Sequence, residues 1–183
     1  MIFAINLTID GCCDHTRLTG SDEVHEYPAR ILQEVDVLVF GRITYQLMVP
    51  FWPDVAKNHS GATKAANGFA RAFDAVSNII VFSRSLDKAE RKNTRIVRTS
   101  LRHEILQLKQ QQGKNILTGG VDLPSQLIQM GLVNEYHFVI QPTIVGEGRR
   151  LLEGVSLPER LQLKLVDSKI FESGCVALHY LKS

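Results

Sequence analysis

The chain has 183 residues, 44% of them hydrophobic, and its 21 basic and 19 acidic side chains leave a formal net charge of +2. This length supports one substantial core, so we expect a single domain over residues 1–183. The basic residues are scattered, and no apolar run approaches the roughly 20 residues of a membrane helix. These features predict a cytoplasmic protein without membrane or nucleic-acid partners.

The cysteines predict neither a disulfide framework nor a metal site. Cys12, Cys13 and Cys175 are an odd number, and they form no CxxC pair. This spacing fits reduced thiols in the cytoplasm.

Apolar periodicity predicts strands that alternate with helices, followed by strands alone. In chain order we expect a strand at 2–9, a helix at 22–34, a strand at 35–40 and a helix at 60–75. Strands at 79–82 and 95–97, a helix at 101–112, a strand at 115–118 and a helix at 122–130 should follow. The chain should end with strands at 136–145, 161–166 and 175–181. Pro28 either marks the start of the first helix or distorts its first turn. Residues 50–59 are expected to form a long surface loop. The order predicts an α/β fold with a mixed, mainly parallel sheet and an antiparallel C-terminal hairpin.

Three polar motifs follow predicted parallel strands, and ligands bind beyond the carboxyl ends of such strands. Gly119-Gly120 precedes a helix that Asp122 can cap, and glycines allow backbone amides to approach a pyrophosphate closely. A simple tight turn is the alternative for this pair.

Arginine and hydroxyl side chains form the other two motifs. Gly41-Arg42-x-Thr44 and Ser83-Arg84-Ser85 offer guanidinium and hydroxyl groups that suit phosphate oxygens, and an arginine near the adenosine ribose favours NADPH over NADH. Each arginine is alternatively a solvated surface charge.

The order and spacing of these motifs resemble the dihydrofolate-reductase-like superfamily over nearly the whole chain. The similarity is greatest to the stand-alone relatives of the RibD C-terminal reductase domain of riboflavin biosynthesis. The residues that carry it are Thr8 to Gly11, Val37 to Tyr45, Val81 to Arg84, Leu117 to Gly120, Gly131 to Glu135, Pro142 to Gly148 and Val176 to Tyr180.

The resemblance implies a three-layer α/β/α fold and an NADPH-dependent reductase. It places Gly41, Arg42 and Thr44 at the cofactor phosphates, Ser83 and Arg84 at the adenosine end, and Gly119, Gly120, Val121 and Asp122 at the pyrophosphate. A small heterocycle, like a pterin or a pyrimidine, would accept the hydride at a C=N or C=O group. The relatives associate through sheet edges, so the resemblance also implies a homodimer as one option.

Catalytic chemistry is assigned to Asp10, which faces the nicotinamide and substrate region in the resemblance. A carboxyl with a raised pKa can act as an acid beside a hydride acceptor, whereas the alternative role of Asp10 is the first residue of an Asp-Gly turn. His25 and Glu26 are candidate proton donors or surface residues. A second function is a module that binds NADPH without turnover.

Overall fold

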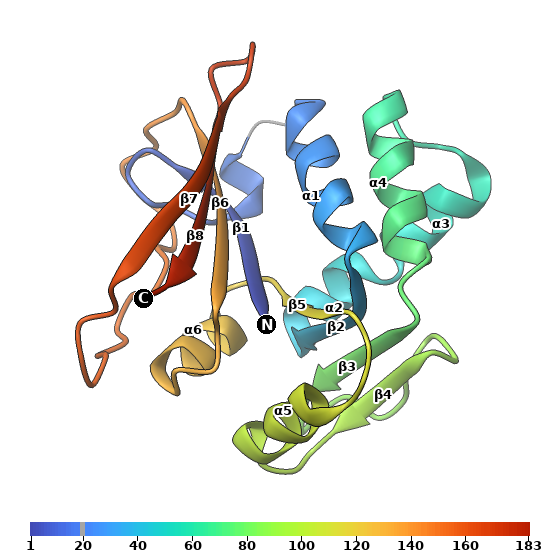
Figure 1. The fold of residues 1–183 in the computed structure, drawn as a ribbon. Helices are drawn as coiled ribbons and strands as arrows, with labels where there is room; N and C mark the ends of the chain where they lie inside the picture. Colours follow the sequence, from blue (N-terminus) through green and yellow to red (C-terminus); the bar gives the residue numbers. More distant parts are fainter. Residues whose placement is uncertain (19–20) are drawn as a thin grey trace.

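The computed structural model describes residues 1–18 and 21–183, and in this part of the chain eight strands form one sheet with the order β4-β3-β2-β5-β1-β6-β8-β7 (Figure 1). The strands β1 to β6 are parallel, and β8 runs antiparallel between β6 and β7. Their bounds are β1 (Ile2–Thr8), β2 (Val35–Gly41), β3 (Asn78–Phe82), β4 (Thr94–Val97), β5 (Asn115–Thr118), β6 (Glu135–Gln141), β7 (Leu163–Ile170) and β8 (Val176–Lys182). The mixed, mainly parallel sheet and its antiparallel C-terminal hairpin are confirmed.

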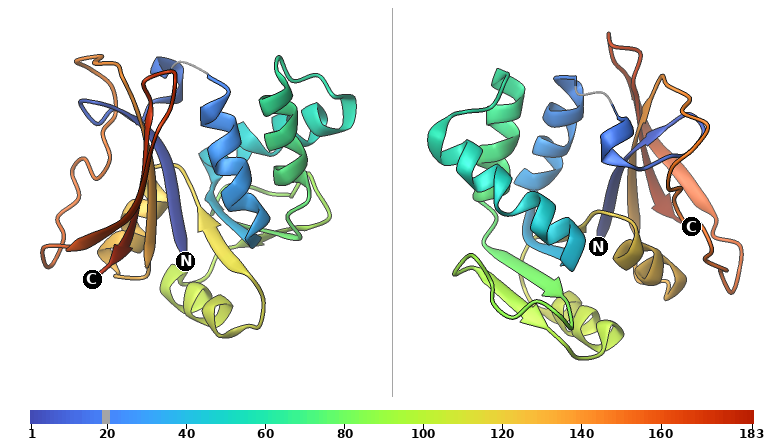
Figure 2. Two further views of the ribbon diagram at one scale, coloured as in Figure 1. Left: turned by 45° about the horizontal axis from the view of Figure 1, so that its top comes forward. Right: turned by 180° about the vertical axis from the view of Figure 1, so that it is seen from behind.

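Helices cover both faces of the sheet, as the three-layer α/β/α prediction requires (Figure 2). They are η1 (His15–Arg17), α1 (Glu23–Gln33), α2 (Arg42–Met48), α3 (Phe51–Asn58), α4 (Lys64–Asp74), α5 (Leu101–Gln110) and α6 (Asp122–Gln129). The helices α1 to α4 contribute to the core on one face, and α5 and α6 to the core on the other. No helix in residues 1–18 and 21–183 is both long and apolar enough to cross a bilayer.

The apolar spacing within α4 shows why these segments fold as they do. Phe69 and Phe73 are four residues apart, so they lie on one face of the helix, and both are buried. Phe73 stacks on Phe40 of β2, with ring centroids 6.3 Å apart. Burying each such side chain contributes about 1.5–3 kcal/mol, so the helix is stabilised mainly by its contact with the sheet.

The prediction of a long loop at residues 50–59 is wrong, because α3 occupies most of this segment. Pro53 is the third residue of the helix. Backbone N–H groups in the first turn have no acceptor within the helix, so the absence of this group in proline removes no helical hydrogen bond. Trp52 packs on Phe69 at 4.6 Å between ring centroids, and Val55 is buried. Tertiary packing therefore forms a short helix where local turn signals predicted a loop.

Other boundaries differ from the predictions for identifiable reasons. Helix α1 begins at Glu23 and continues through Pro28, so the proline marks neither the start nor the first turn. Its cost in a helix interior, about 3 kcal/mol, is opposed by the burial of Val24, Ile31 and Leu32. Strand β6 ends at Gln141, before Pro142, and β7 continues four residues beyond its predicted end at Val166.

Candidate cofactor and active site

The three predicted cofactor motifs lie at the carboxyl edge of neighbouring strands. Gly41, the last residue of β2, pairs with Phe82, the last residue of β3, so Arg42 and Ser83 leave the sheet side by side. Strand β5 pairs with β2 on its other side and leads into the glycine pair. The structure therefore brings the three motifs together along one edge, as predicted from the order of the strands.

Gly120 has a conformation and a neighbour that only glycine suits. Its φ is +87°, and a Cβ atom on it would overlap the Oγ1 atom of Thr44. Gly119 is less constrained, because a Cβ there would meet the carbonyl oxygen of Ala4 at an ordinary 3.5 Å. The bare backbone of Gly120 thus allows the chain before α6 to pack directly on α2.

The start of α6 differs from the prediction that Asp122 caps it. Val121 is the N-cap residue, and in the described chain no side chain caps this end of the helix. Asp122 is the first helical residue, and its carboxylate forms a two-pronged ion pair with Arg149. This carboxylate raises the pKa of Arg149 further. The arginine compensates a negative charge that would otherwise repel a phosphate at this position.

The predicted phosphate-binding arginines are exposed. Arg42 donates a hydrogen bond from Nη1 to Oε1 of Gln46, one turn further along α2, at 2.8 Å. Arg84 follows Ser83, whose Oγ accepts hydrogen bonds from the backbone N–H groups of Ser85 (3.2 Å) and Leu86 (2.9 Å). Ser83 thus fixes the turn that presents Arg84 at the end of β3.

Asp10 lies at the same edge, in the turn after β1. Its carboxylate accepts hydrogen bonds from the Thr8 hydroxyl at 2.7 Å and from the backbone N–H groups of Val145 (3.3 Å) and Gly146 (3.0 Å). The hydroxyl and then these amides lower the pKa of Asp10 to about 2. Arg150 lies 3.5 Å from the same carboxylate. The raised pKa expected of an acid is therefore absent, and the carboxylate joins the end of β1 to the loop after β6.

His25 and Glu26 occupy α1, but His25 is engaged by aromatic rings. Its ring centroid lies 5.6 Å from that of Trp52 and 6.1 Å from that of Phe69. Cys12 is buried and Cys13 is half-buried, and burial raises the pKa of the Cys13 thiol. The ring contacts of His25 and the burial of the two cysteines favour structural roles for these side chains.

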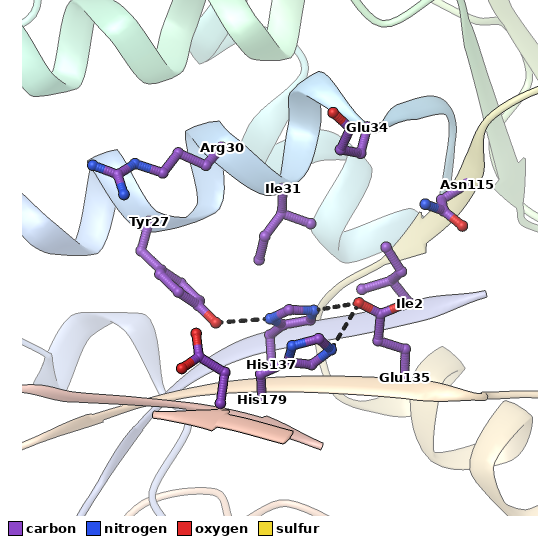
Figure 3. A pocket seen from close by; sticks show the side chains of 10 residues that line it. Ile2, Tyr27, Arg30, Ile31, Glu34, Asn115, Glu135, His137 and His179 are labelled. Atoms are coloured by element: carbon purple, nitrogen blue, oxygen red, sulfur yellow. Dashed lines mark hydrogen bonds and ion pairs between the residues drawn. The ribbon is translucent and has the colours of Figure 1, made fainter. Parts of the chain in front are cut away.

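A pocket of about 290 Å³ lies at the opposite, amino edge of the parallel strands (Figure 3). Ile2, Asn115 and Glu135, the first residues of β1, β5 and β6, are among the side chains that line it. His137 and His179 also line the pocket and lie beside Glu135. Glu-x-His in a strand was a detectable signal, since residues i and i+2 face the same side, but only the pairing of β6 with β8 supplies the second histidine.

Two further arginines lie at the carboxyl edge and were not predicted from the sequence. Arg149 pairs with Asp122 across 27 residues, and nothing in the local sequence indicates this contact. Arg98 follows β4 directly, and its Nη2 donates to the carbonyl oxygen of Leu86 at 2.6 Å, beside the turn that carries Arg84. The recurrence of arginine after a strand was the signal that could have revealed Arg98.

The chain belongs to the RibD C-terminal domain family, which matches residues 1–177. It is 29% identical over 160 residues to the uncharacterised protein YyaP of Bacillus subtilis (strain 168), covering 81% of this chain and 75% of YyaP. The resemblance found in the sequence is thereby confirmed.

Solved structures show the same fold. A pyrimidine reductase-like protein from Corynebacterium diphtheriae superimposes with a TM-score of 0.65 at 14% identity, covering 100% of this chain and 91% of that protein. A diaminohydroxyphosphoribosylaminopyrimidine deaminase/5-amino-6-(5-phosphoribosylamino)uracil reductase from Thermotoga maritima gives a TM-score of 0.66 at 14% identity, covering 100% of this chain and 56% of that protein. The family and these neighbours are reductase-like, which supports an oxidoreductase of the RibD type.

Proposed function

We propose that the protein is an NADPH-dependent reductase acting on a small heterocycle, similar to a pterin or a pyrimidine. The observation that carries this proposal is Gly120, whose bare backbone brings the start of α6 against Thr44 at the carboxyl edge of the sheet. In the described chain, no side chain caps the start of α6, so its first backbone N–H groups suit a phosphate. The residues present therefore fit a dinucleotide.

The chain's own residues would hold the cofactor along this edge. Thr44, Gly119 and Gly120 would meet the pyrophosphate with hydroxyl and backbone N–H groups. The Asp122–Arg149 pair would keep this end of α6 close to neutral. At the adenosine end, we assign Arg84 to the 2′-phosphate, with Arg98, which directly follows the neighbouring strand β4, as a second cation.

Bound NADPH would supply a hydride to the carbon of a C=N or C=O group, whose nitrogen or oxygen then takes a proton. The pKa of Asp10, about 2, favours its ionised form at neutral pH, so in this proposal another group supplies the proton. We propose that Asp10 acts as a positioning residue, which holds the loop from Pro142 to Gly146 at the mouth of the site. A proton from solvent or from the substrate is consistent with this arrangement.

The state of Asp10 also favours a second candidate function, a module that binds NADPH without turnover. Its carboxylate is already satisfied by Thr8 and two backbone N–H groups, which leaves the acid step without the residue predicted for it. NADPH oxidation in the presence of a pterin, pyrimidine and quinone panel separates the two. Turnover with any member supports the reductase, and binding without turnover supports the module.

Thermal unfolding with NADPH, with NADH and without ligand tests the cofactor itself. A ligand at 100 times its Kd adds about 2.7 kcal/mol to the folded state, which raises Tm by about 5–10 °C for a chain of this size. We expect this rise with NADPH and a smaller one with NADH. An unchanged Tm with both would contradict the cofactor assignment.

A further inference from the structure

Two histidines and a glutamate meet in the pocket at the amino edge of the sheet, away from the proposed cofactor site (Figure 3). Glu135 and His137 are two residues apart in β6, so their side chains lie on the same face. His179 in β8 pairs directly with His137 across the antiparallel ladder. Strand pairing therefore places the three side chains together, with donor atoms that all lie within 4.8 Å of one another.

Both imidazoles converge on one carboxylate oxygen. The Nε2 atom of His137 lies 2.8 Å from Oε1 of Glu135, and the Nε2 atom of His179 lies 3.0 Å from the same oxygen. The Nε2 atom of His179 is screened from solvent and has no aligned hydrogen bond to any described residue. A buried nitrogen that lies 3.0 Å from a carboxylate oxygen without forming a hydrogen bond to it is available as a metal ligand.

We propose that Glu135, His137 and His179 bind a divalent first-row transition-metal ion of the zinc class. Two imidazoles and one carboxylate are a ligand set that Zn²⁺ accepts in proteins. Bonds of about 2.0–2.1 Å in a tetrahedral site separate ligand atoms by about 3.3 Å, only slightly more than the 2.8 and 3.0 Å found here. The two rings now stack nearly parallel, with centroids 4.1 Å apart, so binding requires a rotation of His179, which is one quarter exposed.

Tyr27 completes the surroundings of the site. Its hydroxyl oxygen lies 2.8 Å from Nδ1 of His137 and can accept the Nδ1–H bond, which leaves the Nε2 lone pair of that ring for a metal. The tyrosine thus orients the ring, and because its hydroxyl can donate or accept, it can take the Nδ1–H bond once Nε2 binds a metal.

The charges around the pocket favour a cation. Glu34 and Asp167 line it together with Glu135, and Arg30 is the positive side chain among the lining residues. Asp167 pairs with His179 in the β7–β8 ladder, so a third carboxylate lies beside the ligands. Three protein ligands leave a coordination position open toward the pocket, as in zinc sites that bind a water or a small ligand.

This inference does not depend on the proposed reductase function. The ligands come from the first and third residues of β6 and from β8, whereas the glycine pair follows the carboxyl end of β5. Zinc binding and NADPH binding can therefore be measured separately, and the failure of one leaves the other intact.

Calorimetric titration of the full chain with ZnCl₂ after treatment with EDTA tests the site, with thermal unfolding as a second readout. We expect one Zn²⁺ per chain and a Tm rise of about 5–10 °C at 100 times the Kd, while MgCl₂ has no effect. His179→Ala should weaken Zn²⁺ binding by about 100-fold or more, because it removes one of three ligands. Tyr27→Phe should weaken it by about 10-fold through loss of the supporting hydrogen bond.

His103→Ala is the matched control, because His103 is exposed on α5 and belongs to neither site. It should bind Zn²⁺ like the unmodified chain. Equal affinity in His179→Ala and the unmodified chain, or no binding at all, would overturn the proposal. Circular dichroism checks that His179→Ala is folded, and Glu135→Gln, which keeps the shape of the side chain, gives the same test if it is not.

Discussion

Gly120 lies against the side chain of Thr44, and this contact joins the chain before α6 to the first turn of α2. The two elements follow β5 and β2, which are neighbours in the sheet, so the contact brings the starts of α6 and α2 together at the carboxyl ends of these strands. A left-handed φ of +87° and the absence of a Cβ atom are both needed for this approach.

Gly120→Ala should therefore lower the free energy of unfolding by about 2–5 kcal/mol. A left-handed conformation costs a non-glycine residue about 1–2 kcal/mol, and forcing a methyl group against Thr44 adds about 1–3 kcal/mol. Urea denaturation measures the change. Binding of NADPH to the variant should also weaken, because the added methyl group must move the start of α6 away from Thr44 in α2.

Gly154→Ala separates the two causes of this loss. Gly154 has a similar φ of +71°, but a Cβ atom on it would meet no described atom within 4 Å. Its substitution should cost only the backbone strain, about 1–2 kcal/mol. In the Gly120→Ala background, Thr44→Ala should restore part of the lost stability, because it removes the overlapping oxygen. Equal losses in the two glycine variants would show that the contact with Thr44 is not tight.

Arg84→Ala should weaken NADPH binding by about 10-fold or more and leave NADH binding nearly unchanged. The exposed guanidinium at the end of β3 is assigned to the 2′-phosphate, which NADH lacks, and a charge-assisted hydrogen bond contributes about 1.5–3 kcal/mol. Fluorescence titration with both cofactors measures the ratio. Arg71→Ala, at an exposed position on α4, is the control for a general loss of positive charge. An equal loss for both cofactors would remove the assigned role.

Much of the fold could be predicted because the strands have a strong local signal. Continuous apolar runs such as Val35 to Phe40 belong to strands buried in a parallel sheet, and the helices between them carry clear amphipathic spacing. The helix from Phe51 to Asn58 was not predicted because Pro53, the preceding Pro50 and an aromatic pair indicate a turn locally. The helix depends on the packing of Trp52 against Phe69, which no local pattern contains.

In the candidate site too, some features follow from the local sequence and others depend on tertiary contacts. The motifs at Gly41, Ser83 and Gly119 could be placed at one edge, because all parallel strands end on the same side. The pairing of Asp122 with Arg149 and the meeting of His137 with His179 connect residues 27 and 42 positions apart. Such contacts depend on the register of the finished sheet, so sequence spacing alone does not reveal them.

Substitution of Arg149 should lower NADPH affinity, whereas substitution of its partner Asp122 should not. Arg149→Met leaves the Asp122 carboxylate uncompensated at the first turn of α6, where it repels a phosphate, so affinity should fall by about 5- to 50-fold. Asp122→Asn removes the repelling charge, so affinity should stay equal or increase. Both side chains are about half exposed, so each change should cost no more than about 1 kcal/mol of stability. A loss of affinity in both variants would indicate that Asp122 itself contacts the cofactor.

Asp10→Asn should reduce stability at neutral pH and remove part of the acid sensitivity of the protein. The pKa of Asp10 is about 2 in the folded chain, below its ordinary value of 3.8, because the Thr8 hydroxyl and the N–H groups of Val145 and Gly146 stabilise the charged form. The unfolded chain therefore binds the proton first as the pH falls. The contribution of Asp10 is complete above about pH 4 and disappears as the pH falls through about 2.

Urea denaturation at several pH values between 7 and 2 measures this contribution. The difference in unfolding free energy between the unmodified chain and Asp10→Asn should be largest above pH 4 and should shrink toward pH 2. Asp87→Asn, at an exposed position after β3, removes the same charge without touching the loop after β6 and should leave the curve nearly unchanged. A difference that stays constant with pH would mean that the carboxylate is not held by these hydrogen bonds. Asp10 would then be free to take up a proton, and the acid role predicted from the sequence would replace the positioning role.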